Sequence, residues 1–401
     1  MRYVPRLVEK RLHAMLAAFP AVLLVGPRQC GKSTLARHAL PDWTHLDLER
    51  PADSDLLTAD LEGYFDAHPR SVVLDEAQRL PELFPFLRHL IDRSRGRGRF
   101  LLLGSAAPSL MRAVSETLAG RVAILELTPI LPSELAGKRL ASDRWFWGGF
   151  PSVLAHREAR VREEWLAAYV STFLERDLPA LGLSLPARRL RRLWTMLTHV
   201  HGSLLNASDL ARSLAVTPQT VARDLDVLEG SFMIRRLQPF HANVQKRLTK
   251  SPKLYVRDSG LLHFLAGLRG ARDLETWPKR GSSFEGLVIE QLMAIANESL
   301  VRPEFYFWRT HAGAEVDLLI VTGRRILPVE IKLGVAVGSR DVSGLRQCMQ
   351  DLGLARGIVV ARVPERRLLS PSIEIVPWSE VAAGRVDLTG ARVRAAVTTP
   401  R

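Results

Sequence analysis

The sequence predicts an α/β protein of several domains, and three observations carry this prediction. Short apolar runs at residues 21–25, 71–74, 100–103 and 122–127 have the composition of buried parallel strands. Segments with helical spacing alternate with these runs, as they do in βαβ units. The length of 401 residues exceeds what one domain usually holds. The first 130 residues are therefore expected to form a parallel sheet covered by helices.

Composition places the chain among ordinary soluble globular proteins. Hydrophobic residues make up 47% and charged residues 24% of the sequence, which excludes a disordered, collagen-like or disulfide-stapled protein. The two cysteines, Cys30 and Cys348, indicate a reducing compartment without a disulfide framework. No apolar stretch has the length of a membrane span, and the apolar run 15–25 leads into a loop instead of a cleavage site. We therefore expect a cytoplasmic protein that has no membrane partner.

The chain is strongly basic. Its 56 lysines and arginines against 42 acidic residues give a formal charge of +14. Such an excess favours a polyanionic partner, either nucleic acid or an acidic membrane surface. Charge alone does not choose between these two partners.

A phosphate-binding motif follows the first apolar run. Its letters fit G-x-x-x-x-G-K-[ST], between a strand and a helix expected from Gly31 to Leu40. The glycines let the backbone curl so that its N–H groups point at nucleotide phosphates, at the positive end of the helix. Lys32 adds charge on these phosphates and Ser33 offers a hydroxyl to Mg²⁺. We therefore expect ATP and Mg²⁺ as cofactors. The residues expected to bind them are Gly26, Pro27, Arg28, Gln29, Cys30, Gly31, Lys32, Ser33 and Thr34.

An acidic pair ends the apolar run at 72–74. A carboxylate at the tip of a strand can hold magnesium, so we assign Asp75 to the metal together with Ser33. Its neighbour Glu76 is assigned as the base that polarises the attacking water. A solvated acidic pair at a strand end is the alternative interpretation.

Two further residues are candidates for roles in hydrolysis. Ser105 follows the apolar run 100–103, where a hydroxyl is placed to orient the attacking water. Arg121 stands directly before the run 122–127. These positions resemble the sensor serine and the trans-acting arginine of ring-forming AAA+ ATPases, in which the arginine stabilises charge on a neighbour's nucleotide. An ordinary surface arginine is the alternative for Arg121.

Six segments together resemble one family. They are GPRQCGKST at 26–34, VVLDEAQ at 72–78, LLLGSA at 101–106, ETLAGR at 116–121, YVSTFLERDL at 169–178 and LYVRDSGLLH at 254–263. From about residue 5 to about residue 335, the chain resembles bacterial and archaeal AAA+ ATPases that carry the C-terminal domain of unknown function DUF4143. The resemblance implies a homo-oligomer such as a hexameric ring. It also implies four parts, which are an AAA+ ATPase core (1–130), a helical lid (131–203), a winged helix-turn-helix (204–270) and a restriction-endonuclease-like α/β domain with a C-terminal tail (271–401).

Residues 204–240 have the pattern of a helix-turn-helix. A short amphipathic helix over 209–214 precedes a turn, and Thr217 and Pro218 begin a second helix that stops at Gly230. A strand over 231–237 follows as a wing. The residues expected on the outward face of the second helix are Gln219, Thr220, Arg223 and Asp224.

Basic residues beyond this unit favour a nucleic-acid partner. The basic run that follows the wing contains Lys246, Arg247, Lys250 and Lys253. With the exposed face of the second helix, it predicts DNA contact. A winged helix that packs subunits together is the alternative. Arginine runs at 93–99 and 188–192 would extend a phosphate track, although each run alone is more often a solvated face.

Acidic residues form a second candidate site near the C-terminal end. A polar stretch over 271–282 is expected to be a linker, followed by a helix, three strands, a helix over 340–352 and a strand ending near Ala361. The arrangement resembles the PD-(D/E)xK nuclease superfamily. In that resemblance Asp317 and Glu330 share a divalent metal, Lys332 stabilises developing charge and Glu285 adds a helix-borne acid. A degenerate nuclease fold, with the acids in structural ion pairs, is the alternative.

These patterns predict an ATP-hydrolysing motor that works on DNA. Branched DNA such as a Holliday junction is the candidate substrate, by analogy with branch-migration motors. One alternative is an ATP-gated, metal-dependent endonuclease. A second alternative is a nucleotide-dependent switch that binds a protein partner.

Overall fold

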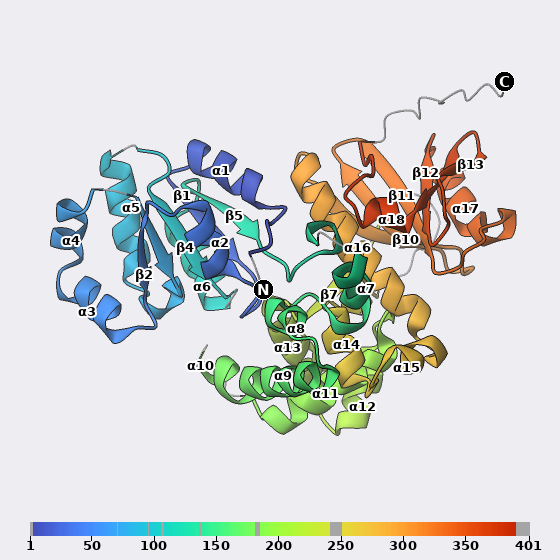
Figure 1. Cartoon of the computed structure of the whole chain (residues 1–401), viewed down its shortest axis with the longest axis horizontal. Helices are drawn as coiled ribbons and strands as arrows, with labels where there is room; N and C mark the ends of the chain where they lie inside the picture. Colours follow the sequence, from blue (N-terminus) through green and yellow to red (C-terminus); the bar gives the residue numbers. More distant parts are fainter. Residues whose placement is uncertain are drawn as a thin grey trace. The chain divides into compact units, whose positions relative to one another are not determined.

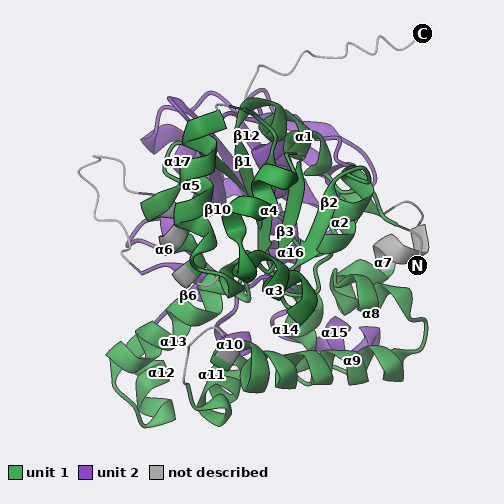
Figure 2. Ribbon diagram, turned by 90° about the vertical axis from the view of Figure 1, so that its left-hand side faces the viewer, with its two compact units in different colours: residues 1–196, 207–235, 258–269 green, residues 197–206, 236–257, 270–401 purple. Residues whose placement is uncertain are grey.

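The computed structural model describes residues 3–69, 71–94, 96–105, 108–135, 138–180, 185–240 and 251–389. The chain divides into two compact units, each built from three separate segments (Figure 2). Unit 1 contains Met1–Met196, Ala207–Arg235 and Asp258–Arg269, whereas unit 2 contains Leu197–Asn206, Arg236–Arg257 and Gly270–Arg401.

Unit 1 is built around a sheet in which all neighbouring strands are parallel. Its strands are β1 (Ala21–Val25), β2 (Thr44–Asp47), β3 (Val72–Asp75), β4 (Phe100–Gly104) and β5 (Val122–Glu126). They lie in the order β2-β3-β4-β1-β5. The predicted parallel-sheet core is therefore confirmed, and the four strands expected from apolar runs, β1, β3, β4 and β5, lie within a residue or two of those runs.

Helices cover both faces of this sheet (Figure 1). The covering helices are α1 (Glu9–Ala18), α2 (Lys32–Ala39), α3 (Pro51–Ala59), α4 (Leu61–Ala67), α5 (Leu83–Ser94) and α6 (Pro108–Thr117). Apolar side chains of α1 and α2 pack on one face, with Val22 and Leu24 of β1. Those of α3 to α6 pack on the other face, with Ala21, Leu23 and Val25. Burial on both faces explains why the strands have uninterrupted apolar sequences.

The remainder of unit 1 is helical. Its helices are α7 (Lys138–Trp147), α8 (Pro151–Ala155), α9 (Ala159–Thr172), α10 (Leu178–Ala180), α11 (Ala187–Val200), α12 (Ala207–Leu214), α13 (Pro218–Gly230) and α14 (Ser259–Leu265). A π-helical turn, Phe173–Asp177, joins α9 to α10, and the last residues of α11 belong to unit 2. The two helices predicted within residues 204–230 are present as α12 and α13. The hydroxyl of Thr217 caps α13 by accepting a hydrogen bond of 3.2 Å from Thr220 N.

One expectation for α13 is wrong. Asp224 was predicted to face outward with Arg223, but its side chain is fully buried and accepts two hydrogen bonds from Arg189 of α11, at 2.9 and 3.0 Å. A buried carboxylate needs such a partner. The partner lies on another helix, so the spacing within α13 could not reveal it.

The second sheet is mixed, and most of it belongs to unit 2. Its strands are β6 (Ser203–Leu204), β7 (Ile234–Pro239), β8 (Lys253–Val256), β9 (Glu304–Arg309), β10 (Glu315–Thr322), β11 (Arg325–Lys332), β12 (Gly357–Ala361), β13 (Arg367–Ser370) and β14 (Ile373–Pro377). Among the described residues they follow the order β13-β14-β12-β11-β10-β9-β7-β8-β6. The helices of unit 2 are α15 (Ala271–Thr276), α16 (Arg280–Ser299), α17 (Ser343–Asp351) and α18 (Trp378–Val381).

Two expectations for unit 2 are corrected. The stretch 271–282, predicted to be a linker, forms α15 and the first turn of α16. The ordered part also extends past Ala361, where β14 pairs in parallel with β12 and continues the sheet. The predicted order of one helix, three strands, a helix and a strand is confirmed as α16, β9, β10, β11, α17 and β12. The predicted C-terminal tail lies outside the described residues.

A β-bulge interrupts the pairing of β10 with β9. The register shifts between Val316 and Leu319, so the alternation of faces along β10 is broken there. As a result, Val316, Leu319 and Val321 all join the core that packs against α17. In the part of the chain that the structure describes, no helix is both long and apolar enough to cross a membrane.

The buried His263 of α14 makes the stability of unit 1 depend on pH. The side chain is 1% exposed, Nδ1 lies 2.9 Å from Phe146 O, and burial lowers the pKa to about 4 from 6.5. The unfolded chain therefore binds a proton at a higher pH than the folded chain does. Stability from the neutral imidazole is complete above pH 6.5 and is lost as the pH falls towards 4, by about 3 kcal/mol in all.

Urea unfolding of the protein and of His263→Gln, measured between pH 4 and 7, tests this expectation. The stability difference between the protein and His263→Gln should change by about 3 kcal/mol from pH 7 to pH 4, whereas replacement of the exposed His13 by Gln should give no such pH-dependent difference. Equal slopes in the protein and in His263→Gln would show that His263 does not cause the dependence.

Candidate functional site

The loop between β1 and α2 has the curled backbone that the phosphate motif predicts. Gln29 and Gly31 have positive φ angles of 60° and 103°. A Cβ atom on Gly26 would lie 2.2 Å from Leu127 O, so only glycine fits where the loop passes the chain beyond β5. The ammonium of Lys32 donates to Gly26 O at 3.0 Å and Pro27 O at 3.1 Å. The loop is therefore closed around its own lysine.

Cys30 contributes to the loop only through its backbone. Its side chain is fully buried, and the Sγ atom lies 3.5 Å from Leu127 O. Burial raises the pKa of the thiol, which makes Cys30 a poor nucleophile. Cys30 O accepts a hydrogen bond of 3.0 Å from Arg6 Nη1, which fixes this side of the loop.

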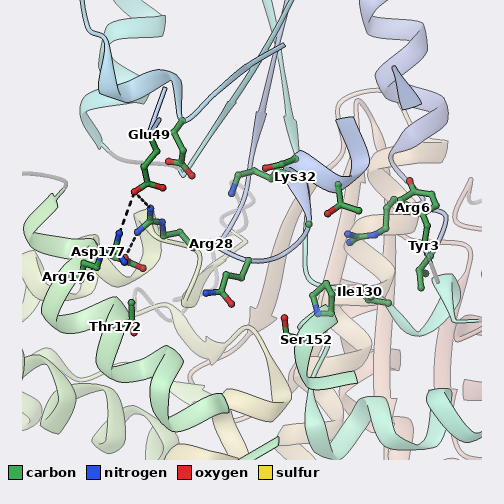
Figure 3. A pocket seen from close by; sticks show the side chains of 17 residues that line it. Tyr3, Arg6, Arg28, Lys32, Glu49, Ile130, Ser152, Thr172, Arg176 and Asp177 are labelled. Atoms are coloured by element: carbon green, nitrogen blue, oxygen red, sulfur yellow. Dashed lines mark hydrogen bonds and ion pairs between the residues drawn. The ribbon is translucent and has the colours of Figure 1, made fainter. Parts of the chain in front are cut away.

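A cavity of about 610 Å³ opens beside the loop (Figure 3). This volume is within the range of sites for small ligands and cofactors. Seven of the predicted site residues line it: Arg28, Gln29, Gly31, Lys32, Ser33, Thr34 and Glu76. The other lining residues are Tyr3, Val4, Arg6, Glu49, Ile130, Pro151, Ser152, Thr172, Arg176 and Asp177.

The acidic pair lies at the end of β3 on the same side of the sheet as the loop. Parallel pairing brings Asp75 next to Asp47, the last residue of β2. Glu76 follows with φ 53°, a conformation that a residue with a side chain rarely adopts. Such strain is concentrated at functional sites, where surrounding contacts maintain it.

Gln78 links two of the predicted catalytic residues. Its Nε2 donates to Glu76 Oε2 and, at 3.2 Å, to Ser105 Oγ at the end of β4. The amide therefore fixes the carboxylate that we assign as the base relative to the hydroxyl that we assign to the attacking water. Gln78 was not among the predicted residues, although it ends the VVLDEAQ segment.

A network of ion pairs connects the phosphate loop to the helical part of unit 1 (Figure 3). Arg28 pairs with Asp177 of the π-helical turn and, at 3.5 Å, with Glu49. Glu49 also lies 2.9 Å from Arg79 and 3.7 Å from Arg176. Burial opposes the charge of Arg28, but Asp177 and Glu76 outweigh it and raise the pKa of Arg28.

Arg121 does not enter this cavity. It precedes β5 and its carbonyl accepts a hydrogen bond of 3.3 Å from Ala21 N, at the start of β1. Because the strands are parallel, this edge of the sheet is opposite to the one that carries the phosphate loop. The guanidinium binds both oxygens of Asp92, at 2.6 and 2.9 Å, on an exposed surface. A role on a neighbour's nucleotide stays a prediction.

The predicted acidic residues of unit 2 do come together. The pairing of Leu318 with Val329 places Asp317 of β10 beside Glu330 of β11. Lys332 Nζ lies 2.7 Å from Glu330 Oε1. Burial and the proximity of Asp317 raise the pKa values of both Glu330 and Glu285, on α16.

Lys253 of β8 lies within this acidic group. Its Nζ is 3.1 Å from Glu285 Oε1 and 3.4 Å from Asp317 Oδ1, and it also pairs with Glu315. Burial opposes the charge of Lys253, but Glu285 and its other acidic neighbours raise the pKa well above the ordinary value. Lys253 is 2% exposed, so its inclusion in a DNA-binding basic run is wrong. The sequence did not reveal that Lys253 is buried, because its acidic partners are remote in the sequence.

The helix-turn-helix residues differ in accessibility. Gln219 and Arg223 are exposed on α13, whereas Thr220 is half-buried with its hydroxyl 3.0 Å from that of Thr217. Lys246, Arg247 and Lys250 lie outside the described residues. The arginine runs at 93–99 and 188–192 are partly used inside the fold. Arg93 binds Asp66, Arg99 binds Phe65 O, Arg189 binds Asp224 and Arg191 binds Ser171.

Three consecutive parts of the chain match known protein families. An AAA domain matches residues 18–136, and two domains of unknown function match 138–272 (DUF8612) and 280–381 (DUF4143). An uncharacterized protein of Mycobacterium tuberculosis is 42% identical over 382 residues, which cover 94% of this chain and 84% of that protein. An uncharacterized protein of Mycobacterium bovis matches to the same extent. The chain belongs to this family of AAA-domain proteins with a C-terminal DUF4143.

Membership of the AAA/DUF4143 family confirms the predicted resemblance and the predicted enzyme class. The AAA domain contains the intact phosphate loop, so the protein is a P-loop ATPase and binds a nucleotide. Among solved structures, a Walker-type ATPase of Pyrococcus abyssi is similar at a TM-score of 0.43 and 15% identity, covering 64% of this chain and 94% of that chain.

In this AAA/DUF4143 protein, Gln78→Leu should slow hydrolysis without weakening nucleotide binding. The substitution removes the amide that orients Glu76 and Ser105 but leaves every loop contact in place. We expect the turnover rate to fall by about 10- to 100-fold at an unchanged nucleotide Kd, which is the usual effect of losing a residue that positions a catalytic group.

Steady-state ATPase kinetics with fluorescent-nucleotide titration measure both quantities. Gln347→Leu, which removes a half-buried glutamine paired with Asp351 of α17, serves as the matched control. A Gln78→Leu protein with full turnover would reject the positioning role.

Proposed function

We propose that this ATPase couples hydrolysis to the movement or remodelling of DNA, with branched DNA such as a Holliday junction as a candidate substrate. The observation that carries the DNA assignment is the helix-turn-helix, whose second helix, α13, presents Gln219 and Arg223 to solvent. In such motifs the second helix enters the major groove. The formal charge of +14 supports a polyanionic partner.

The hydrolytic roles follow from the phosphate loop, the end of β3 and the contacts of Gln78. Lys32 binds the phosphates, Glu76 polarises the attacking water, and Gln78 with Ser105 orients it. Ser33 and Asp75 offer a hydroxyl and a carboxylate, the oxygen ligands that Mg²⁺ prefers. Bound there, Mg²⁺ would neutralise charge on the phosphates.

The order of elements supports the finer domain assignments. The chain order α11, β6, α12, α13, β7, β8 is that of a winged helix, and β6 pairs with β8 in antiparallel fashion. The order from α16 to β12 and the Asp317–Glu330 neighbourhood support a restriction-endonuclease-like fold for unit 2. Both modules are DNA-docking folds in this proposal.

The position of Arg121 supports assembly into a homo-oligomer such as a hexameric ring. The guanidinium lies on the surface, at the sheet edge opposite to the cavity of its own chain. From this position, an arginine that takes part in hydrolysis would act on a nucleotide bound by a neighbour, as a trans-acting arginine does.

A nucleotide-dependent switch that binds a protein partner is the second candidate. It is favoured by the pairing of Arg28 with Asp177, because a triphosphate in the cavity would compete with this carboxylate for Arg28 and so act on the π-helical turn. In this alternative the basic charge serves solubility.

DNA should stimulate the ATPase and bind with strong salt dependence. We expect the hydrolysis rate to rise with four-way-junction or duplex DNA, and Lys32→Ala to abolish hydrolysis.

The affinity for DNA should fall as the salt concentration rises. Counterion release requires log K to fall with log salt by about 0.9 per neutralised phosphate on duplex DNA. Arg223→Ala should reduce this slope by about 0.9, whereas removal of the exposed Arg157 should not. Binding that is absent at low salt, or is independent of salt, would favour the protein-partner switch.

Arg121→Ala should leave nucleotide binding intact and lower the hydrolysis rate by about 10³-fold or more. Mixing it with Lys32→Ala subunits should restore activity, because the second variant supplies the missing arginine to a competent site. Asp92→Ala is the control, since it removes the exposed partner but keeps the arginine. Normal hydrolysis by Arg121→Ala alone excludes the role on a neighbour's nucleotide.

A further inference from the structure

The acidic group of unit 2 contains its own cation. We call Glu285, Glu315, Asp317 and Glu330 the carboxylate cluster. They come from α16, β10 and β11, and the ammonium of Lys253 contacts the first three of them. Lys253 Nζ also lies 5.8 Å from the centroid of the Phe307 ring, which adds a cation–π contact. At 2% exposure the ammonium is enclosed by the fold.

The oxygens of the cluster are almost all committed to protein donors. Asp317 Oδ2 accepts from Ile331 N at 2.8 Å, and Glu315 Oε2 accepts from Arg309 at 2.6 Å. Tyr255 donates to Glu285 Oε1 at 2.5 Å. Glu330 Oε1 is bound by Lys332, whereas Glu330 Oε2 is buried without a hydrogen-bond partner.

These contacts do not fit a divalent cation. A divalent cation binds carboxylate oxygens directly, and Mg²⁺ usually takes one or two carboxylates together with several waters. Here the ammonium of Lys253 already contacts three of the four carboxylates, and Lys332 binds the fourth. Within the described ranges, no group of three or more acidic, histidine or cysteine side chains is arranged to hold a metal ion. The charge that a metal would supply is already provided by Lys253, with Lys332 and Arg309 at the edges.

We propose that Lys253 is a built-in cation that takes the place of the divalent metal in a nuclease-like carboxylate arrangement. The cluster then fixes β8 against α16 and β10, binds no metal and cuts no nucleic acid. The ammonium is part of the Lys253 side chain, so a chelator cannot remove it. The carboxylate cluster therefore always holds this cation and has no room for a metal ion. This inference is independent of the proposed motor function and decides against the endonuclease alternative.

Mn²⁺ binding by the full-length chain tests the proposal. Titration followed by electron paramagnetic resonance is done without nucleotide and in the Lys32→Ala background, which removes binding that depends on the phosphate loop. The chain with Lys253 intact should bind no Mn²⁺ that depends on Asp317. Lys253→Ala frees carboxylates of the cluster, so we expect it to gain one Mn²⁺ site that depends on Asp317 and that the chain with Lys253 lacks.

The matched control is the double variant Lys253→Ala/Asp317→Asn, which should lose the new site. Mn²⁺ binding by the Lys253-containing chain that disappears with Asp317→Asn overturns the proposal, as does Mn²⁺-dependent nicking of labelled DNA by that chain. A folded Lys253→Ala protein that gains no site also overturns it. Should Lys253→Ala not fold, Lys253→Met preserves the side-chain volume and takes its place.

Discussion

The ammonium of Lys32 requires a counter-charge, and the arrangement of unit 1 follows from this requirement. The side chain is buried, and its Nζ is held by the carbonyl oxygens of Gly26 and Pro27. Carbonyl dipoles offset only part of the cost of burying a cation. The phosphates of a nucleotide carry full negative charges. When a nucleotide binds, these charges can replace the carbonyl dipoles as partners of the Lys32 ammonium. The curled loop, the glycine contact with Leu127 and the helix that follows all hold the lysine where this exchange can occur.

Lys253 shows the opposite use of a buried lysine. Both ammonium groups are at most 5% exposed, yet one faces neutral carbonyls and the other faces carboxylates. Neutral acceptors leave Lys32 ready for an anionic ligand that comes from solution. The carboxylates that contact Lys253 are the strongest hydrogen-bond acceptors that a protein can supply. An anionic ligand from solution would therefore not bind this ammonium more favourably. The nature of the acceptor separates the exchangeable cation from the fixed one.

Local patterns predicted the position of the phosphate loop and of the strand ends, but not the contacts between distant segments. The loop, Asp75 and Glu76 were found because strand ends and motif spacing are short-range features. Gln78 lay within a quoted segment but had no pattern of its own. Asp177 and Lys253 were missed or misjudged because their partners are 149 and 64 positions away. The bulge in β10 has no signal in the sequence of β10 alone, because it depends on the pairing with β9.

The interleaved course of the chain has a consequence for its synthesis. The first segment of unit 1 contains the whole parallel sheet, but the unit is complete only when residue 269 has been made. The two early segments of unit 2 contain β6 and β8. The rest of their sheet, β9 to β14, is synthesised later. The strands of the ATPase sheet therefore leave the ribosome well before Glu330, the last residue of the carboxylate cluster, has been synthesised. No single break in the polypeptide separates one unit from the other, and a break inside residues 197–269 leaves each unit divided between the two fragments.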